Sequence, residues 1–509
     1  MELYIVRHGE SVGNTKRGFV SGRKDKEGLT IKGKSQIIRT SFYLKDKKIT
    51  KVLTSPIQRT LESAYIIGTL LNVSVEKHEF LNELDHGLTG GNYWWDTKHL
   101  LPSHWFKDGK REDFKTPYPD GESFADLAQR VWEGYKNFLL KTSAPFVIMT
   151  HQAIIATLVF CASVGNPHKH EDEYLNFIHS FFTPNGGIIK MSGAFEQINA
   201  HVIKNLSPID HSNSSVRFYI AGILTSRQGK ITSHRISSVS KNAVYKIHTP
   251  QEYIFKILSD QHILASQRLI NLYSLLEEKT KIPSPHIIHY DESSVFFPYP
   301  LMLQDYKKGV ELSVCLKSHT HSSLGFLSTL LTALEKLHSL KLEGVSKNWF
   351  PQNWVKYISS EITNTKSALS KFKLGKDKKT HILTQLSNLK KYIESHQYVE
   401  TPIHADLSPN NIIVHHEKKE CSLTGILDFD RVRFGDPLWD IVYFYGWLER
   451  INKKAALEWK TLVFKKKSYD AKIFELYRTL FHAWTVRDMF DYKKDGERKK
   501  AGLLSLALF

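Results

Sequence analysis

Short apolar runs alternate with longer amphipathic stretches along residues 1–205. Three of these runs, 3–6, 51–54 and 146–149, are predicted strands, and Ser55 begins a predicted helix as its capping residue. Because strand and helix signals take turns, the pattern predicts an α/β domain with a mostly parallel sheet. Polar residues follow each run at the strand's carboxyl end, the edge where parallel sheets bind ligands.

The remainder of the chain has a different pattern. Residues 206–215 are rich in Ser, Asn and Pro, which is typical of a linker. Strand signals follow, and helical periodicity then dominates, interrupted by two strand-like segments. At 509 residues the chain exceeds one ordinary core. We therefore predict a domain at 1–205, a linker at 206–215, and a second domain at 216–509 with a small lobe at 216–305 and a large lobe at 306–509. We expect the two domains to fold independently.

Composition narrows the choice of partner and compartment. The net charge of +18 favours anionic ligands, but the lysines are scattered and no aromatic-rich basic module accompanies them. We therefore expect phosphorylated small molecules as partners and no nucleic acid. The three cysteines lack metal-like spacing, which favours a reducing, cytoplasmic location. An apolar window at 146–161 is interrupted by a His-Gln pair, so we expect a strand and a helix there and no membrane span.

The first candidate site begins with the sequence Arg7-His8-Gly9-Glu10 directly after a predicted strand. A neutral histidine can attack phosphorus when positive charge surrounds the equatorial oxygens of the phosphoryl group. Arg7 and Arg59 are suited to hold those oxygens through their planar forks, and His151 is a further donor. Glu83 offers a carboxyl group for protonating the leaving oxygen.

These residues, with Asn14, Gly22, Gly33, Gln36 and Gly121-Glu122-Ser123, resemble the histidine phosphatase superfamily and its three-layer phosphoglycerate mutase-like fold. The resemblance implies His8 as phosphoacceptor, Glu83 as general acid/base, and a site without cofactor or metal. The same resemblance implies that Arg7, Asn14, Arg59 and His151 bind the phosphate. Leu84-Asp85-His86-Gly87 follows the glutamate where mutases have an Arg-His-Tyr-Gly-like stretch. This departure favours hydrolysis over mutase activity, which remains an alternative.

The second candidate site lies in His404-Ala-Asp406-Leu-Ser-Pro-Asn-Asn411 and the following Ile-Leu-Asp428. Asp406 and Asn411 have the offset that phosphoryl-transfer loops use for a base and a metal ligand. Asp428, at the end of an apolar run, is placed to bind the same metal. His404 is expected to orient the loop. We read Asp440, farther along, as structural.

This half resembles the aminoglycoside phosphotransferase and choline kinase group, most closely over residues 403–443. The resemblance implies a two-lobed, protein kinase-like α+β domain that binds ATP and Mg²⁺ through Asn411 and Asp428. Lys256 is the first choice for the nucleotide lysine and Lys246 the second. The group's helical glutamate partner for this lysine has no counterpart around 265–268.

The two motif sets together predict a bifunctional enzyme. It combines a metal-independent phosphomonoesterase with an ATP-dependent kinase acting on a hydroxyl of an amino sugar, amino alcohol, related metabolite or antibiotic. The alternatives are a non-catalytic sensor of nucleotide or phosphate and a nucleic-acid end-processing enzyme. Trp439, Trp447 and Trp484 also allow an aromatic cage for a quaternary ammonium, although core packing is the stronger interpretation for each.

Overall fold

The computed structural model describes most of the chain. Its described residues are 2–102, 105–107, 110–111, 113–139, 145–194, 197–203, 206, 209–224, 231–236, 243–258, 266–317, 325–340, 353–370, 375–395, 401–417, 420–467, 469–491, 502–505 and 507–508. The chain forms two compact units. Unit 1 comprises Met1–Ser259 and His289–Leu303, and unit 2 comprises Asp260–Ile288 and Gln304–Phe509.

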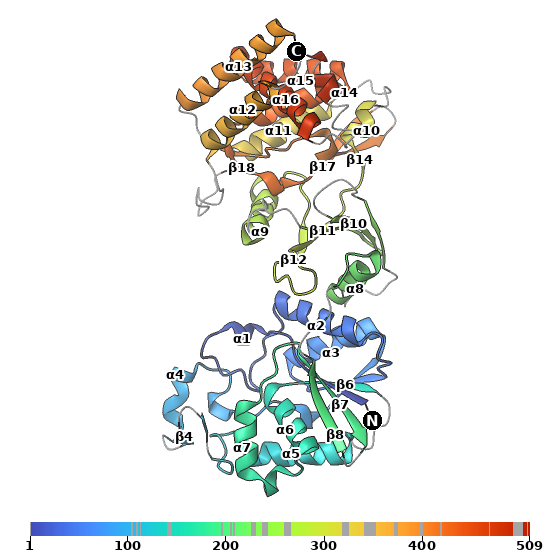
Figure 1. The fold of residues 1–509 in the computed structure, drawn as a ribbon, viewed down its shortest axis with the longest axis vertical. Helices are drawn as coiled ribbons and strands as arrows, with labels where there is room; N and C mark the ends of the chain where they lie inside the picture. Colours follow the sequence, from blue (N-terminus) through green and yellow to red (C-terminus); the bar gives the residue numbers. More distant parts are fainter. Residues whose placement is uncertain are drawn as a thin grey trace. The chain divides into compact units, whose positions relative to one another are not determined.

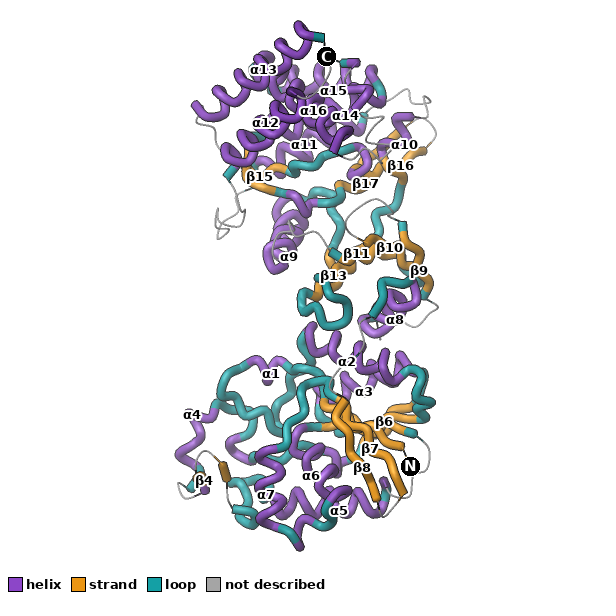
Figure 2. Tube along the Cα trace, in the orientation of Figure 1, coloured by secondary structure: helices purple, strands orange, loops and turns teal. Residues whose placement is uncertain are grey.

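A six-stranded sheet forms the centre of unit 1 (Figures 1 and 2). Its order is β3-β2-β6-β1-β7-β8, and the first four strands run parallel. The antiparallel pairs β1–β7 and β7–β8 complete it. The strands are β1 (Glu2–Arg7), β2 (Lys51–Thr54), β3 (Ser74–Lys77), β6 (Phe146–Thr150), β7 (Ile188–Ala194) and β8 (Gln197–Ile203). The three apolar runs chosen from the sequence are therefore strands, as predicted.

Helices cover both faces of this sheet, which gives the predicted three layers (Figure 1). On one face α5 (Phe124–Asn137), α6 (Gln152–Ser163) and α7 (Glu171–Ser180) share a buried core with the sheet. On the other lie α2 (Ile31–Leu44) and α3 (Gln58–Leu71). Short helices α1 (Val12–Thr15) and α4 (Trp94–Thr97) lie in connections. The fold class of the first part is confirmed.

Helix α8 (Asn213–Ile223) packs on α2 and α3 within unit 1. Phe218 meets Phe42 edge-on with ring centroids 5.2 Å apart, and Gly222 lies against Ile38. Tyr219 and Ser35 both donate hydrogen bonds to the buried carboxylate of Asp291. By contacts, α8 and most of the small-lobe strands therefore group with unit 1, while the predicted domain boundaries and independent folding stay predictions.

The small-lobe sheet has the order β12-β13-β11-β10-β9. Its strands are β9 (Thr232–Arg235), β10 (Ala243–His248), β11 (Glu252–Ile257), β12 (Ile287–Asp291) and β13 (Leu301–Asp305). Alternate residues of β10 are buried, which is the pattern of a strand with one face on a core. The β-rich segments predicted after the first domain are therefore present.

Unit 2 is mainly helical (Figure 2). Its helices are α9 (Ser266–Leu275), α10 (Leu312–Lys317), α11 (Phe326–His338), α12 (Trp354–Ser370), α13 (Lys376–Ser395), α14 (Leu438–Ile451), α15 (Lys453–Lys466) and α16 (Ala471–Asp491). Two small antiparallel sheets accompany them, built from β14 (Val310–Glu311), β16 (Ile412–Glu417) and β17 (Glu420–Ile426), and from β15 (Thr401–Ile403) and β18 (Arg433–Gly435). This mixture of antiparallel sheets and helices agrees with the kinase-like α+β class.

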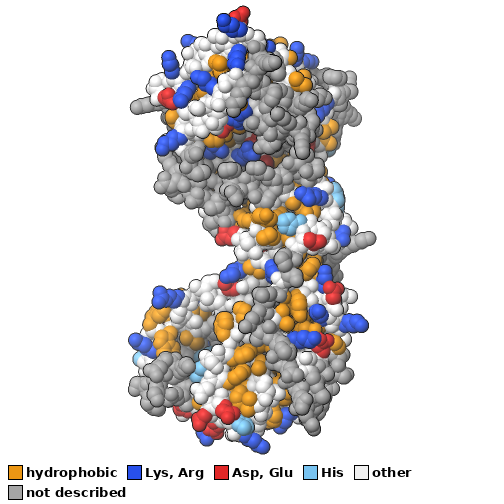
Figure 3. All heavy atoms as spheres, in the orientation of Figure 1, with side chains coloured by type: hydrophobic (Ala, Val, Ile, Leu, Met, Phe, Trp, Pro, Cys, Tyr) orange, Lys and Arg blue, Asp and Glu red, His pale blue; other side chains and the backbone are white. Residues whose placement is uncertain are grey.

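Two expectations about the surface can be compared with the structure. Among the described helices none is long and apolar enough to cross a membrane, and the apolar window is strand β6 followed by helix α6. On the face drawn in Figure 3, Lys and Arg side chains are spread among acidic and neutral ones. This distribution agrees with the prediction of solvated, scattered lysines.

Candidate functional site

His8 lies directly after β1, buried beside the carboxyl end of the sheet. Its Nδ1 is 2.7 Å from the Gly9 carbonyl oxygen, so Nδ1 carries the proton and donates it. Nε2 accepts a hydrogen bond of 3.2 Å from the Arg59 Nε. Burial, reinforced by the charge of Arg59, holds the pKa of His8 well below its ordinary value. His8 is therefore a neutral imidazole with its Nε2 lone pair directed at a guanidinium group.

Two glycines allow this placement. A side chain on Gly9 would come within 2.2 Å of the Gly33 carbonyl oxygen, and one on Gly33 within 2.1 Å of the Glu10 carbonyl oxygen. The loop after His8 and the first turn of α2 therefore approach more closely than any other residue type would allow.

Three predicted phosphate ligands gather around His8. Arg59 is buried on α3 and also donates to the backbone oxygens of Ser21 and Gly22. The His151 ring lies 5.2 Å from the His8 ring and its Nε2 contacts the Ser55 hydroxyl at 3.0 Å. Two buried nitrogens, Arg7 Nε and His151 Nδ1, have no hydrogen-bond partner among the described residues. Such orphaned polar atoms beside a nucleophile fit a site built for an oxyanion.

Asn14 lies at the exposed side of this group. Its Oδ1 accepts hydrogen bonds from the Ser11 amide at 3.1 Å and from the Asn185 side chain at 3.2 Å. Asn185 also donates to the His8 carbonyl oxygen. Asn14 is thus linked to the His8 loop through Asn185 and caps α1, and its phosphate-binding role stays a prediction.

Glu83 follows a turn of 3₁₀ helix, η1 (Glu79–Leu81), and is half-buried. Burial raises the pKa of its carboxyl group, while Arg59 and Arg7 oppose that shift by a smaller amount. The charges of these two arginines therefore act on Glu83 as well as on His8. A carboxyl group with a raised pKa keeps its proton to higher pH, as a general acid requires.

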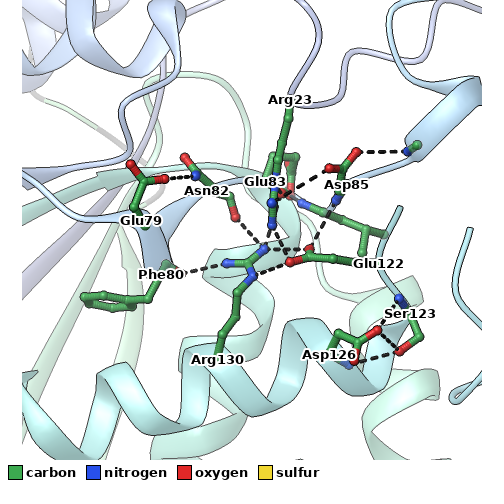
Figure 4. Close-up of polar contacts among 12 residues, drawn as sticks. Arg23, Glu79, Phe80, Asn82, Glu83, Asp85, Glu122, Ser123, Asp126 and Arg130 are labelled. Atoms are coloured by element: carbon green, nitrogen blue, oxygen red, sulfur yellow. Dashed lines mark hydrogen bonds and ion pairs between the residues drawn. The ribbon is translucent and has the colours of Figure 1, made fainter. Parts of the chain in front are cut away.

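A network around Glu122 holds the Glu83 loop, and sequence reasoning assigned no role to Glu122, Arg130 or Arg23 (Figure 4). Arg130 on α5 donates to the Glu122 carboxylate at 2.8 and 3.0 Å and to the carbonyl oxygens of Asn82 and Glu83. Arg23 donates to the same carboxylate and to the Glu83 carbonyl oxygen at 2.8 Å. Two signals were available in the sequence: Glu122 is part of the resemblance motif, and Arg130 is a charged residue next to the buried Val131 of α5.

The second site is built on the loop after β15. The buried Asp440 carboxylate accepts hydrogen bonds from the backbone amides of His404 and Ala405 at 2.8 and 2.9 Å. His404 donates from Nε2 to the Leu427 carbonyl oxygen and accepts at Nδ1 from the Asp406 amide. Ala405 has a φ of 62°. Asp440 and His404 thus fix a strained loop, which agrees with the orienting and structural roles predicted for them.

Asp406, the predicted base, accepts a hydrogen bond of 2.9 Å from the Tyr443 hydroxyl. Burial raises the pKa of Asp406, and Arg431, whose Nε lies 3.6 Å from Oδ2, opposes that shift. The Asn411 side chain donates to the Asp406 carbonyl oxygen at 2.8 Å, which leaves its amide oxygen for a ligand. Sequence reasoning did not identify Tyr443 or Arg431.

The predicted metal ligands lie next to each other. The Leu427 amide donates to the Asn411 carbonyl oxygen at 2.7 Å, so Asp428 follows directly beside Asn411. Asp428 has a φ of 65° at the start of the turn η10 (Phe429–Arg431). Amide and carboxylate oxygens suit Mg²⁺, which retains water and substrate phosphates as its other ligands. These side chains fit the predicted cation.

The predicted nucleotide lysine belongs to unit 1, whereas Asp406, Asn411 and Asp428 belong to unit 2. Lys256 is buried on β11, and Lys246 on the neighbouring β10 forms an ion pair of 2.9 Å with Glu252. Lys256 stays the first choice and Lys246 the second, as predicted from the sequence. Residues 238–242, whose sequence resembles the turn that covers the nucleotide in the aminoglycoside phosphotransferase group but lacks its usual glycines, lie outside the described residues.

Comparison with protein families agrees with both sites. Residues 3–176 match the model of the histidine phosphatase superfamily (branch 1), and residues 232–459 match that of the phosphotransferase enzyme family. The chain joins a histidine phosphatase domain to a phosphotransferase-family domain. Both predicted resemblances are confirmed, and each motif set lies inside its matched segment.

Curated relatives match the phosphatase domain. Human 6-phosphofructo-2-kinase/fructose-2,6-bisphosphatase 1 is 29% identical over 159 residues, which are 31% of this chain and 31% of that protein. The Arabidopsis thaliana protein named 6-phosphofructo-2-kinase/fructose-2,6-bisphosphatase is 29% identical over 160 residues, 31% of this chain and 20% of its own length. This chain therefore spans less than a third of the length of these relatives.

Solved structures match the same domain. The alpha-ribazole phosphatase from Shigella flexneri is 22% identical and has a TM-score of 0.35, with 40% of this chain and 96% of that chain covered. A mycobacterial glucosyl-3-phosphoglycerate phosphatase is 20% identical with a TM-score of 0.34, and the match covers 40% of this chain and 97% of that one.

Proposed function

We propose that the phosphatase domain hydrolyses phosphomonoesters through a phosphohistidine. The observation that carries this proposal is the neutral His8, whose Nε2 lone pair faces Arg59 with His151 alongside. Nε2 attacks the phosphorus, the ester bond breaks, and Glu83 gives its proton to the leaving oxygen. Water then attacks the phosphohistidine, with Glu83 accepting a proton, and releases inorganic phosphate. These steps need no metal.

Activity against an aryl phosphate in EDTA tests this proposal. Full activity is expected with the chelator, and none with His8→Ala. Denaturing the enzyme in alkali during turnover should trap phosphate on the wild type and not on the variant. A requirement for added divalent cation would contradict the proposed mechanism.

We further propose that the second domain transfers the γ-phosphoryl group of ATP to a hydroxyl of a small molecule. Asp406 removes the proton of the acceptor hydroxyl, whose oxygen attacks the γ-phosphorus as ADP leaves. Asn411 and Asp428 would hold Mg²⁺, which neutralises charge on the phosphates, and Lys256 would pair with the nucleotide. The observation that supports this proposal is the geometry of the loop. Asp440 holds the loop through the Ala405 amide, and the Asn411 side chain donates a hydrogen bond to the Asp406 carbonyl oxygen.

Two substitutions separate the base from the metal ligand. Asp406→Asn should abolish transfer and leave the affinity for Mg–ATP within about twofold of the wild type, because the base acts on the acceptor. Asp428→Ala should weaken Mg–ATP binding itself, measured by calorimetry on the full chain. Normal turnover by Asp406→Asn would refute the role of base.

The combined activity is that of a bifunctional enzyme with a phosphorylated substrate at one site and a hydroxyl-bearing acceptor at the other. The relatives named above pair a kinase with a bisphosphatase by name, which supports two opposing phosphate chemistries in one chain. The cysteines Cys161, Cys315 and Cys421 are all free and buried, which supports the proposed cytoplasmic location.

A further inference from the structure

The aromatic side chains near Asp406 already carry cations of the protein itself. Three arginines lie over three rings: Arg433 over Tyr357 at 3.7 Å, Arg450 over Trp447 at 4.1 Å and Arg487 over Trp484 at 5.4 Å. An aromatic cage for a cationic ligand needs open ring faces. The arginines over Trp447 and Trp484 therefore favour the core interpretation of these rings over the alternative of a cage for a quaternary ammonium. Trp439 is fully buried, as the core interpretation predicted.

Tyr443 links some of these rings to the base Asp406. Tyr443 donates its hydroxyl hydrogen to Asp406, and its ring lies 6.5 Å from that of Trp484. Trp447 follows Tyr443 by one turn of α14. The pKa of Tyr357 is raised by burial, and charges of Arg433, Arg431 and Asp406 act on the same hydroxyl. Arg433 is thus linked to Asp406 through Tyr357, and Arg450 acts on Tyr443, the hydrogen-bond donor to Asp406.

The charges here are not balanced by carboxylates. Glu361 and Asp488 are both engaged by Arg487, at 2.9 and 3.3 Å. Within the described residues no carboxylate lies in ion-pair distance of Arg433 or Arg450. The Nε and Nη2 atoms of Arg450 are also buried without a hydrogen-bond partner there. Burial lowers the pKa of Arg450 to about 10, so it remains charged at neutral pH.

We infer that the acceptor of the kinase site is an anionic hydroxyl compound, one bearing a phosphate or carboxylate group, with Arg433 and Arg450 as the residues that select it. This inference rests on the proposed kinase function. A cationic acceptor would meet the guanidinium groups of Arg433 and Arg450, which no carboxylate of the described residues pairs, whereas an anion would gain charge-assisted hydrogen bonds from them. The amino sugar or amino alcohol predicted from the sequence has the opposite charge. An anionic acceptor also suits a chain whose other domain takes phosphate esters.

The test is an acceptor screen on the full chain with ATP and Mg²⁺, in which the release of ADP is measured. Acceptors are supplied as sets that share one skeleton and differ in charge, for example glucosamine, glucose and glucose 6-phosphate, and glycerol with glycerate and glycerol phosphate. The His8→Ala chain is used so that the phosphatase site does not consume the esters. The best acceptor should be anionic, with kcat/KM about tenfold or more above the neutral member of its set, the effect of one charge-assisted contact.

Arg433→Gln and Arg450→Gln should each lower kcat/KM for the anionic acceptor by about tenfold, chiefly through KM, and change that for the neutral member by less than about twofold. Arg433→Lys keeps the charge and should retain most of the activity. A preference for the amines, or equal losses on charged and neutral acceptors, would overturn the inference and leave the kinase function standing. Failure of the chain to bind Mg–ATP or to phosphorylate any acceptor would instead refute the proposed kinase.

Discussion

Glu122→Gln is the most informative substitution in the phosphatase domain, because Glu122 touches neither His8 nor the phosphate ligands. Its carboxylate accepts two hydrogen bonds from Arg130, one from Arg23 and one from the Asp85 amide. Both arginines also hold the Glu83 carbonyl oxygen. The neutral amide of glutamine is nearly the same size but removes the charge and turns one hydrogen-bond donor toward a guanidinium.

The magnitude follows from the burial of this network. Glu122 is 17% exposed, Arg130 20% and Arg23 27%. Removing one partner of a fully buried ion pair costs about 3–5 kcal/mol, and partial exposure reduces that to roughly 2–3 kcal/mol. For a domain of this size the melting temperature should fall by about 5–10 °C. Displacing the Glu83 carboxyl group by even an ångström should slow proton donation by about 10- to 100-fold.

The assay compares two leaving groups. Glu122→Gln should slow hydrolysis of an alkyl phosphate far more than that of 4-nitrophenyl phosphate, whose leaving group needs no proton. Asp126→Asn is the matched control on the same segment, because it removes a carboxylate that only caps α5 through Ser123. It should cost about 1 kcal/mol of stability without any leaving-group effect. Equal losses on both esters in Glu122→Gln would refute the positioning role.

Three further predictions concern other parts of the molecule. Burial raises the pKa of Glu83 and lowers that of His8, so kcat/KM for alkyl phosphates should have an acidic optimum and should fall as the pH rises through the Glu83 pKa. An alkaline optimum of kcat/KM would contradict the role of Glu83 as general acid. A fragment 1–224 should melt about 10 °C above a fragment 1–205, since α8 covers two or three apolar side chains worth about 1.5–3 kcal/mol each. Equal melting curves would show that α8 adds nothing to the first domain and would support the predicted linker at 206–215. Asp440→Asn should destabilise the kinase domain by about 1–3 kcal/mol and abolish phosphoryl transfer, with the kcat of the phosphatase unchanged. Normal transfer by this variant would show that the loop after β15 does not need the Asp440 carboxylate.

Local pattern was sufficient for much of both sites. Arg7 and His8 could be placed because an apolar run ends immediately before them, and parallel strands bring such ends to one edge. Asp406, Asn411 and Asp428 were found through offsets within one loop and the strand that follows it. Strands β1, β2 and β6 of unit 1, strands β9 to β11 of the small lobe, and the strand and helix of window 146–161 were predicted from periodicity.

Partners that are distant in sequence were decided only by the tertiary structure. Glu122 and Arg23 meet across 99 positions, and no local pattern joins them. Helix α8 packs on α2 and α3, and its Tyr219 donates a hydrogen bond to the buried carboxylate of Asp291. Neither contact could be predicted from the polar segment that precedes the helix. The arginines over Tyr357 and Trp447, on which our inference of an anionic acceptor rests, were likewise not evident from local sequence pattern. Sequence determines which groups are chemically able to react, whereas packing determines which charges remain unpaired beside them.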